Sequence, residues 1–366
     1  MLRSIKVWIF TPPLGQSGGI GSLYSYANSH YPENIEVKIV DTRGAYKHPI
    51  FSVIPLTGSI TRLIFARLFK RVDLVHINIA SNGSALRKII IGLVSIFLTR
   101  TPTIFQVHGG KFVSFYSAQS EISKYIILKV LNSSERILLF GSISSASMKL
   151  IGIKSELITE MQMGVPNLLS KDSDELKSDT PNLANTYPII LYSGLLTELK
   201  GFPETIKALA FEAESKTKLI VAGSGDLRQW MGFAANLGLE NRVAFVGQRS
   251  IEEIHSYLQV VDGLILASKF ETLPVSVLEC LSAGKVPIAT MVGNLSEFLN
   301  SENAIIVKSP TESDIACAVM YLEKIYETPT FSNLKIQAKN LWSQKFDVSK
   351  TTLNLVSIWR ENLFEE

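Results

Sequence analysis

Two glutamates, Glu271 and Glu279, stand where the sequence most strongly indicates chemistry. Glu271 follows the predicted strand 263–266. Glu279 lies in a predicted helix that we expect to begin at Pro274, because a proline has no N–H to leave unpaired there. Free N–H groups and the positive end of that helix favour an anion such as phosphate. Carboxylates do not attract phosphate, so these glutamates are better suited to accept hydrogen bonds from hydroxyls of a sugar and a ribose. The alternative is a structural pair of charges at the ends of a half-buried helix.

Glycine-rich turns follow three other predicted strands, and glycine allows a ligand to approach the backbone closely. The first of these turns also opens a helix, where backbone N–H groups can surround an oxyanion. For each turn the alternative is a tight reversal of the chain with no ligand. The candidate residues are Gly18 and Gly19 in the first turn, Gly194 in the second and Gly225 in the third.

A histidine, His108, follows the predicted strand 103–107 and precedes two glycines. A lone histidine is more often structural, but the carboxyl end of a parallel strand is where ligands bind in α/β sheets. We therefore treat His108 as a candidate site residue. The remaining histidines are assigned structural roles only: His30, His48, His76 and His255.

The elements that must position these residues alternate between strand and helix along the chain. Short runs rich in β-branched residues recur between stretches of helical length, and this pattern predicts βα units and parallel sheets. The predicted strands are 5–10, 37–41, 74–77, 103–107 and 136–140 in the first half, and 189–192, 218–222, 243–246, 263–266 and 286–289 in the second.

A chain of 366 residues is long enough for two such domains. We expect an N-terminal domain over 1–170, a polar linker over 171–187 and a second domain over 188–345. The final segment, 346–366, is expected to be a helix that packs back on the N-terminal domain. With ligands at the carboxyl ends of both sheets, a cleft between the two domains would form the site.

The order of motifs in the second half resembles the signature of the retaining glycosyltransferase family 4. Glu271 and Glu279 form a Glu-x7-Glu pair, which is followed by the run LSAGKVPIAT from position 281 and then by Gly293 and Glu297. The resemblance extends over nearly the whole second half. It implies an α/β fold of the GT-B type, in which two Rossmann-like parallel-sheet domains face a central cleft. The resemblance further implies that the first domain, 1–170, binds the acceptor and that the second, 188–345, binds the nucleotide-sugar.

The resemblance also implies roles for individual residues. In the loop YSGLLTELKGF, which starts at position 192, Lys200 matches a lysine that grips the donor's diphosphate, whereas Leu195 stands where the family has a second cation, an arginine. A leucine cannot supply the bidentate phosphate contacts of an arginine. Glu271, Lys200 and His108 are then the catalytic candidates. The substrate-binding candidates are Glu279, Gly18, Gly19, Gly194, Gly225, Arg249, Leu273, Pro274 and Val275.

The activity implied is transfer of a hexose, with retention of configuration, from a UDP- or GDP-sugar to a saccharide or lipid-linked saccharide, in the synthesis of a cell-surface polysaccharide or glycolipid. We find no carboxylate cluster for a metal beside the site and expect no cofactor, so Lys200, helix dipoles and backbone N–H groups would stabilise the leaving diphosphate. Two alternatives remain open. The first is a non-catalytic partner subunit that binds nucleotide-sugar, motivated by Leu195, and the second is an epimerase on the same fold.

Composition and charge bear on compartment and partners. Two cysteines, Cys280 and Cys317, lack metal-ligand spacing and fit a reduced, cytoplasmic setting, and the longest apolar stretch, 89–98, is about half of a membrane span. Residues 1–170 carry 18 Lys and Arg against 8 Asp and Glu, while the remainder carries 18 against 25. The mixed apolar and basic segment 61–71 suits peripheral contact with the inner face of a membrane. Without a basic run interleaved with aromatics, nucleic acid is a poor fit.

Overall fold

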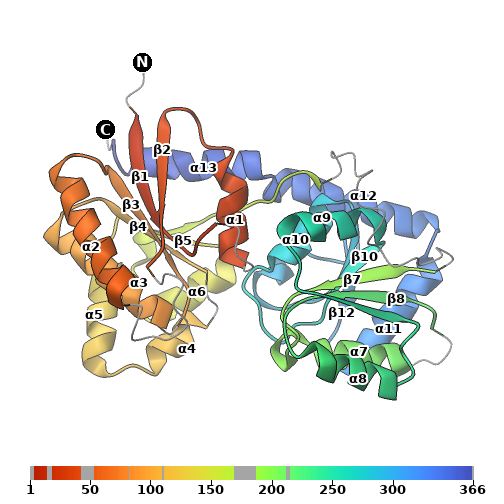
Figure 1. Ribbon diagram of the computed structural model, residues 1–366. Coiled ribbons are helices and arrows are strands. Elements are labelled where there is room, and N and C mark those ends of the chain that lie inside the picture. Colours follow the sequence, from red (N-terminus) through yellow and green to blue (C-terminus); the bar gives the residue numbers. More distant parts are fainter. Residues whose placement is uncertain are drawn as a thin grey trace. The chain divides into compact units, whose positions relative to one another are not determined.

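The computed structural model describes residues 4–14, 19–42, 53–81, 83–108, 111–168, 187–211 and 215–364. The chain forms two compact units. Unit 1 comprises residues 1–164 together with Val348–Glu366, and unit 2 comprises Val165–Asp347. Each unit is built on one parallel six-stranded sheet with helices on both of its faces (Figure 1). The division falls ahead of the linker expected at 171–187, and of that linker only Tyr187 belongs to the described residues.

The sheet of unit 1 has the strand order β2-β1-β3-β4-β5-β6. Its strands β3 and β4 are buried along their whole length, as expected for parallel strands covered on both faces. The strands are β1 Ile5–Phe10, β2 Ile35–Val40, β3 Leu74–Ile79, β4 Thr103–Val107, β5 Arg136–Leu139 and β6 Ile158–Glu160. The helices are α1 Gly19–Asn28, α2 Val53–Leu68, α3 Gly83–Leu93 with its π-helical continuation η2 Val94–Leu98, α4 Phe112–Ser117, α5 Glu121–Leu131, α6 Ser142–Leu150, the short η3 Ser155–Leu157, and α13 Val348–Glu361.

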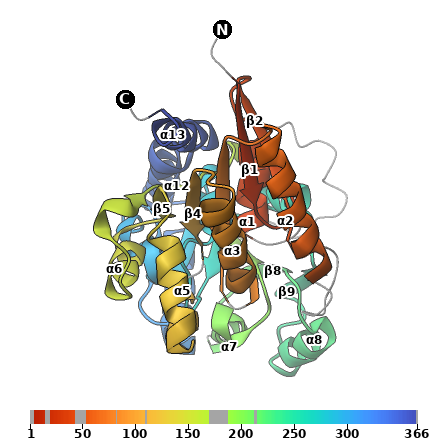
Figure 2. The ribbon, with the colours of Figure 1, turned by 90° about the vertical axis from the view of Figure 1, so that its left-hand side faces the viewer.

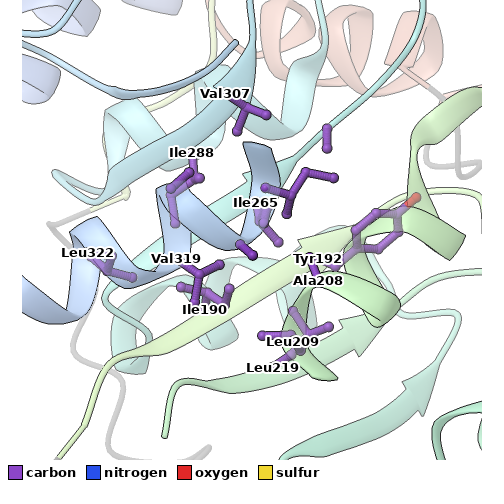
Figure 3. Close-up of a cluster of buried hydrophobic side chains, with 14 of the residues drawn as sticks. Ile190, Tyr192, Ala208, Leu209, Leu219, Ile265, Ile288, Val307, Val319 and Leu322 are labelled. Carbon is purple, nitrogen blue, oxygen red and sulfur yellow. The ribbon is translucent and has the colours of Figure 1, made fainter. Parts of the chain in front are cut away.

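The sheet of unit 2 has the strand order β12-β11-β10-β7-β8-β9, and the order reverses between β7 and β10. The strands are β7 Ile189–Ser193, β8 Lys218–Ala222, β9 Val243–Gly247, β10 Gly263–Leu266, β11 Val286–Thr290 and β12 Ile305–Val307. The helices are η5 Glu198–Lys200, α7 Phe202–Phe211, α8 Leu227–Asn236, α9 Ile251–Val260, α10 Val275–Ser282, η6 Gly293–Glu297, α11 Glu312–Ile325, α12 Pro329–Leu341 and η7 Trp342–Phe346. Figure 3 shows part of its core, where Val319 and Leu322 of α11 and Leu209 of α7 pack on strand residues such as Ile190 and Ile288.

Local sequence explains where several of these helices begin. Ser250 and Glu253 form a capping box at the start of α9, in which each side chain binds the other residue's backbone N–H. At the starts of α11 and α12 only one such bond forms: the side chain of Thr311 or Thr328 accepts from a backbone N–H of the first turn, and Pro329 occupies the first turn of α12. These caps determine the residue at which each helix begins.

Helix α13 belongs to unit 1, although unit 2 separates it from the rest of that unit in the sequence. Its Trp359 is fully buried and donates from Nε1 to Nδ1 of His76 at 3.0 Å. The Nε2 atom of His76 lies 2.9 Å from the hydroxyl of Tyr24, which donates to Gln106. Burial lowers the pKa of His76 to about 3, so the ring is neutral and this network holds α13 to the sheet.

The structure corrects several sequence-based expectations. Every predicted strand exists, but β2 begins at Ile35 and β3 extends to Ile79. The short edge strands β6 and β12 were not predicted. Pro274 is the N-cap of α10, with an extended ψ of 122°, and the first helical residue is Val275. The helix ends as expected, because Gly284 adopts a φ of 63° just beyond it.

Candidate functional site

The central pair of the site joins two loops at the point where the strand order of unit 2 reverses. Lys200 ends η5 after β7, and Glu271 follows β10. The Nζ atom of Lys200 donates to Oε1 of Glu271 at 2.5 Å, and the hydroxyl of Ser268 donates to the same oxygen at 2.9 Å. The Glu271 side chain is 10% exposed and that of Lys200 is 26% exposed. The two catalytic candidates of this unit are therefore in contact, at the edge of the sheet where α/β folds bind ligands.

Close backbone packing holds these two loops together. Gly201 adopts a φ of 65°, and a Cβ at that position would lie 1.9 Å from the carbonyl oxygen of Ala267. The backbone N–H of Lys269 donates to the carbonyl of Leu199 at 2.9 Å. A Cβ on Gly293 would lie 2.1 Å from the carbonyl oxygen of Glu271. Glycine is thus required at Gly201 and Gly293 by sterics, and the geometry of the Lys200–Glu271 pair depends on both.

Helix α10 places the second glutamate of the Glu-x7-Glu pair inside the unit. Glu279 is 6% exposed, and its Oε1 lies 3.8 Å from Nε2 of His255 on α9. His255 was expected to be structural only, whereas the structure brings it beside a candidate ligand residue. Leu273 and Pro274, ahead of the helix, are buried, and Val275, its first residue, is half-buried. Pro274 has no N–H, so any backbone contact with an anion here comes from the N–H of Leu273 or Val275.

The glycines after β7 and β8 bring two loops together. A Cβ on Gly223 would lie 2.0 Å from the carbonyl oxygen of Gly194, and one on Gly225 would lie 2.8 Å from Cβ of Leu196. The N–H of Leu196 donates to Ser224 at 3.0 Å. Loop packing, rather than approach of a ligand, explains the glycines after β8. Gly194 itself has ordinary space for a Cβ.

The remaining cations of the site region already have partners. Arg249 donates to Glu253 at 2.7 Å, and Lys269 pairs with Glu204 at 2.6 Å. The backbone N–H of Ser250 and the guanidinium of Arg249 lower the pKa of Glu253. Leu195, at the position where an arginine was expected, is 53% exposed. Its side chain does not fill the core, so a longer side chain at this position would meet solvent first.

His108 of unit 1 is held by a residue that sequence reasoning missed. Its Nε2 lies 2.6 Å from Oδ1 of Asn78, which is 2% exposed near the end of β3. Since an amide oxygen only accepts, Nε2 carries the proton and Nδ1 the lone pair. Burial, and then the nearby His76, lower the pKa of His108 to about 3, so its ring is neutral. Gly19 is the first residue of α1, and Gly18 lies outside the described residues.

No group of three or more metal-ligating side chains occurs among the described residues. Within the same described ranges, no helix has the length and apolar character needed to cross a membrane.

Comparison with known proteins places these features in context. The family model for "Glycosyl transferases group 1" matches residues 173–340. Alpha-D-kanosaminyltransferase from Streptomyces kanamyceticus is 24% identical over 282 residues, which span 71% of this chain and 70% of that protein.

Solved structures match over almost the whole chain. HepE from Anabaena, in complex with UDP-glucose, superposes with a TM-score of 0.77 and 17% identity over 98% of this chain and all of that chain. Sucrose-phosphate synthase from Thermosynechococcus elongatus gives a TM-score of 0.78 and 16% identity, over 98% and 99% of the two chains. The fold is therefore GT-B, an α/β fold of two Rossmann-like units. The family model and the relative both support a glycosyltransferase.

Proposed function

We propose that this protein is a retaining, metal-independent glycosyltransferase that moves a hexose from a UDP- or GDP-sugar to a saccharide or lipid-linked saccharide acceptor. The observation that carries the proposal is the contact between Lys200 and Glu271 at the reversal of strand order in unit 2. A cation and a hydroxyl-binding carboxylate at adjacent positions suit the two ends of a nucleotide-sugar, namely its diphosphate and its sugar. The UDP-glucose complex of HepE, which has the same fold, supports this class of donor.

The proposed mechanism assigns a step to each of these side chains. Lys200 neutralises charge that develops on the leaving diphosphate, assisted by the N-terminus of α10. Glu271, released from part of its contact with Lys200, accepts hydrogen bonds from hydroxyls of the transferred sugar. Glu279 accepts hydrogen bonds from the ribose, and neutral His108 offers Nδ1 as an acceptor to a substrate hydroxyl. The acceptor hydroxyl attacks the anomeric carbon from the face that the diphosphate leaves, as the bond from that carbon to the diphosphate oxygen breaks. The departing phosphate takes the proton of the hydroxyl, so configuration is retained without an enzyme nucleophile.

A second candidate is a non-catalytic subunit that binds nucleotide-sugar. It is favoured by the composition of the loop, in which Leu195 stands where a second cation was expected. The remaining cation, Lys200, already contacts Glu271. This arrangement would weaken diphosphate binding relative to a loop with two cations.

One experiment separates the two candidates. Purified full-length protein is screened by thermal shift against UDP-, GDP- and ADP-sugars. Hydrolysis of the stabilising donor is then measured with and without an extract of lipid-linked acceptors, in EDTA and in Mg²⁺. We expect turnover that the extract stimulates and that EDTA leaves unchanged. Binding without turnover in either buffer would favour the subunit, and turnover only with Mg²⁺ would refute the metal-independent mechanism.

We also propose that the protein works in the cytoplasm, at the inner face of a membrane, because a lipid-linked acceptor would be presented there. The basic first part of the chain supports this location.

A further inference from the structure

Helix α2 exposes large apolar side chains to solvent. It buries Leu63 and Ala66 in the core of unit 1. Leu68 is 70% exposed, and Phe65 and Phe69 are exposed by more than half. A helix that only covers a sheet presents polar residues outward, and an apolar outer surface of this kind marks an interaction site.

Neighbouring elements extend this surface. Figure 2 shows α2, α3 and α5 side by side over one face of the unit 1 sheet. The guanidinium of Arg67 on α2 donates to the carbonyls of Thr99 and Arg100, directly after η2. Lys129 of α5 lies 5.8 Å from the ring of Phe97 and 6.0 Å from that of Tyr125. We call the surface the basic–apolar face; its exposed apolar members are Phe65, Leu68, Phe69, Phe97, Leu98 and Tyr125.

Basic residues occupy the same face, and the carboxylate of α5, Glu121, is paired with Lys124. Its exposed basic members are Lys70, Arg71, Arg100 and Lys129. The segments 53–71 and 94–101 contain no Asp or Glu. A face that combines apolar side chains with unbalanced positive charge is complementary to a surface that is apolar inside and anionic outside.

Two of these basic residues sit where the backbone favours glycine. Lys70 has a φ of 52° just after α2, and Arg100 has a φ of 48° just after η2. The N–H of Arg71 donates to Ala66, and that of Thr101 donates to Ser95, as in helix ends normally closed by glycine. A lysine and an arginine carry a conformational cost at these positions that glycine would not. Their presence on one face points to a ligand that uses their charge.

We propose that the basic–apolar face docks on a bilayer that contains anionic lipid. A second copy of the chain is a poorer occupant, because a symmetric contact would bring the basic residues of two copies together. The inference deepens the proposed function by naming the surface through which an enzyme with a lipid-linked acceptor would meet its membrane.

The test measures sedimentation of the full chain with vesicles, in the absence of donor. One set of vesicles is phosphatidylcholine, and the other has about a third of its lipid as phosphatidylglycerol. We expect binding to the anionic vesicles that weakens as salt is raised. Failure of the wild-type chain to sediment with them would overturn the proposal.

The double variant Lys70→Gly/Arg100→Gly separates docking from folding. Each basic residue near an anionic surface contributes about a fivefold gain in binding, so we expect a loss of about 25-fold. The midpoint of thermal unfolding should stay the same or rise, because glycine relieves the left-handed backbone. Glu327→Gly is the matched control: Glu327 has a φ of 58° in unit 2, so the change should raise stability without affecting vesicle binding. Unchanged binding in the double variant would contradict a role for these charges.

A second variant set tests the apolar members. Phe65→Ser/Leu68→Ser/Phe69→Ser should reduce vesicle binding by about a hundredfold or more, since each side chain loses its burial in lipid. Phe211→Ser/Met231→Ser/Ile336→Ser removes equally exposed side chains from unit 2 and should bind as the wild type does. Sedimentation velocity tests self-association. If the wild type is a dimer and Phe65→Ser/Leu68→Ser/Phe69→Ser is a monomer, the face is a contact between two copies and the proposal is overturned. Donor hydrolysis, measured separately, distinguishes failure of docking from failure of the proposed activity.

Discussion

The Nζ atom of Lys200 lies 2.5 Å from Oε1 of Glu271, so the cation proposed for the diphosphate is engaged by the carboxylate proposed for the sugar. Binding of a donor would have to divide Lys200 between two anions. A stronger contact between Lys200 and Glu271 therefore weakens binding of the diphosphate, while it keeps Glu271 in position for the transferred sugar.

Replacing Glu271 by glutamine should tighten binding of the free nucleoside diphosphate and lower turnover. The change frees Lys200 from a full negative charge, and a charge-assisted hydrogen bond of this kind typically contributes about 1.5–3 kcal/mol. Isothermal titration calorimetry and a transfer assay measure the two effects. Weaker nucleotide binding in Glu271→Gln would show that the carboxylate orients Lys200 and does not compete for it.

Lys200→Ala should reduce turnover by roughly tenfold to a hundredfold, at about 1.4 kcal/mol per decade, whereas Lys200→Arg should be milder because it keeps the charge. Leu195→Arg offers the complementary gain: Leu195 is exposed, so an arginine fits without displacing the core and should tighten diphosphate binding. Full activity in Lys200→Ala would remove the diphosphate assignment.

Glu279→Ala should mainly weaken binding of the nucleotide, because Glu279 is buried and offers an acceptor to ribose hydroxyls. An unpaired buried hydroxyl costs about 1–3 kcal/mol, and calorimetry with the nucleoside diphosphate measures it. Glu312→Ala, which removes an exposed carboxylate paired with Lys207, is the control. Equal affinity in both variants would contradict the ribose role.

Unit 1 should lose stability as the pH falls from about 6.5. Burial lowers the pKa of both His76 and His108 to about 3, below that of a histidine in the unfolded chain. The unfolded state therefore binds more protons between these values, so the free energy of unfolding falls by about 1.4 kcal/mol per pH unit for each histidine. Urea titrations at a series of pH values test this, and His76→Gln should have a shallower slope than either wild type or the control His30→Gln. A slope unchanged by His76→Gln would refute the assignment.

Asn78→Asp should alter the pH dependence of turnover. A carboxylate beside Nε2 of His108 would raise the pKa of the imidazole, and the charged ring would donate from Nδ1 in place of accepting. We expect activity that falls at acidic pH, where the wild type keeps a neutral His108. Asn78→Leu, which removes the partner without adding charge, should lower turnover at every pH. Identical pH profiles in wild type and Asn78→Asp would exclude this positioning role.

Most central strands were predictable because they are buried along their length and form short apolar runs. A strand such as Gly263–Leu266 can be recognised without knowing its neighbours. The edge strands Ile158–Glu160 and Ile305–Val307 are too short to show a pattern, and they exist because a neighbouring strand offers hydrogen bonds. Helix starts were less certain, and Pro274 lies one position outside the helix that it was expected to begin.

The site was predictable where chemistry and sequence spacing coincide, as for Glu271 and Glu279. Its supporting partners were not, because they come from other elements. His255 approaches Glu279 from α9, and Asn78 approaches His108 from β3. No local pattern marks either residue, since only the packing of the sheets and helices brings them together. The contact of Gly223 with the neighbouring loop could not be predicted from the sequence either.

The return of α13 to unit 1 has a consequence for biosynthesis. Unit 2 is one uninterrupted stretch, and its ends meet where the N–H of Val165 donates to Phe346. All of its strands leave the ribosome before Trp359, which unit 1 requires around His76. Unit 2 can thus fold before unit 1 is complete, because unit 1 needs α13, which is synthesised last. Ribosome-bound chains halted after unit 2 should resist protease at the strands of unit 2 and be cut at those of unit 1.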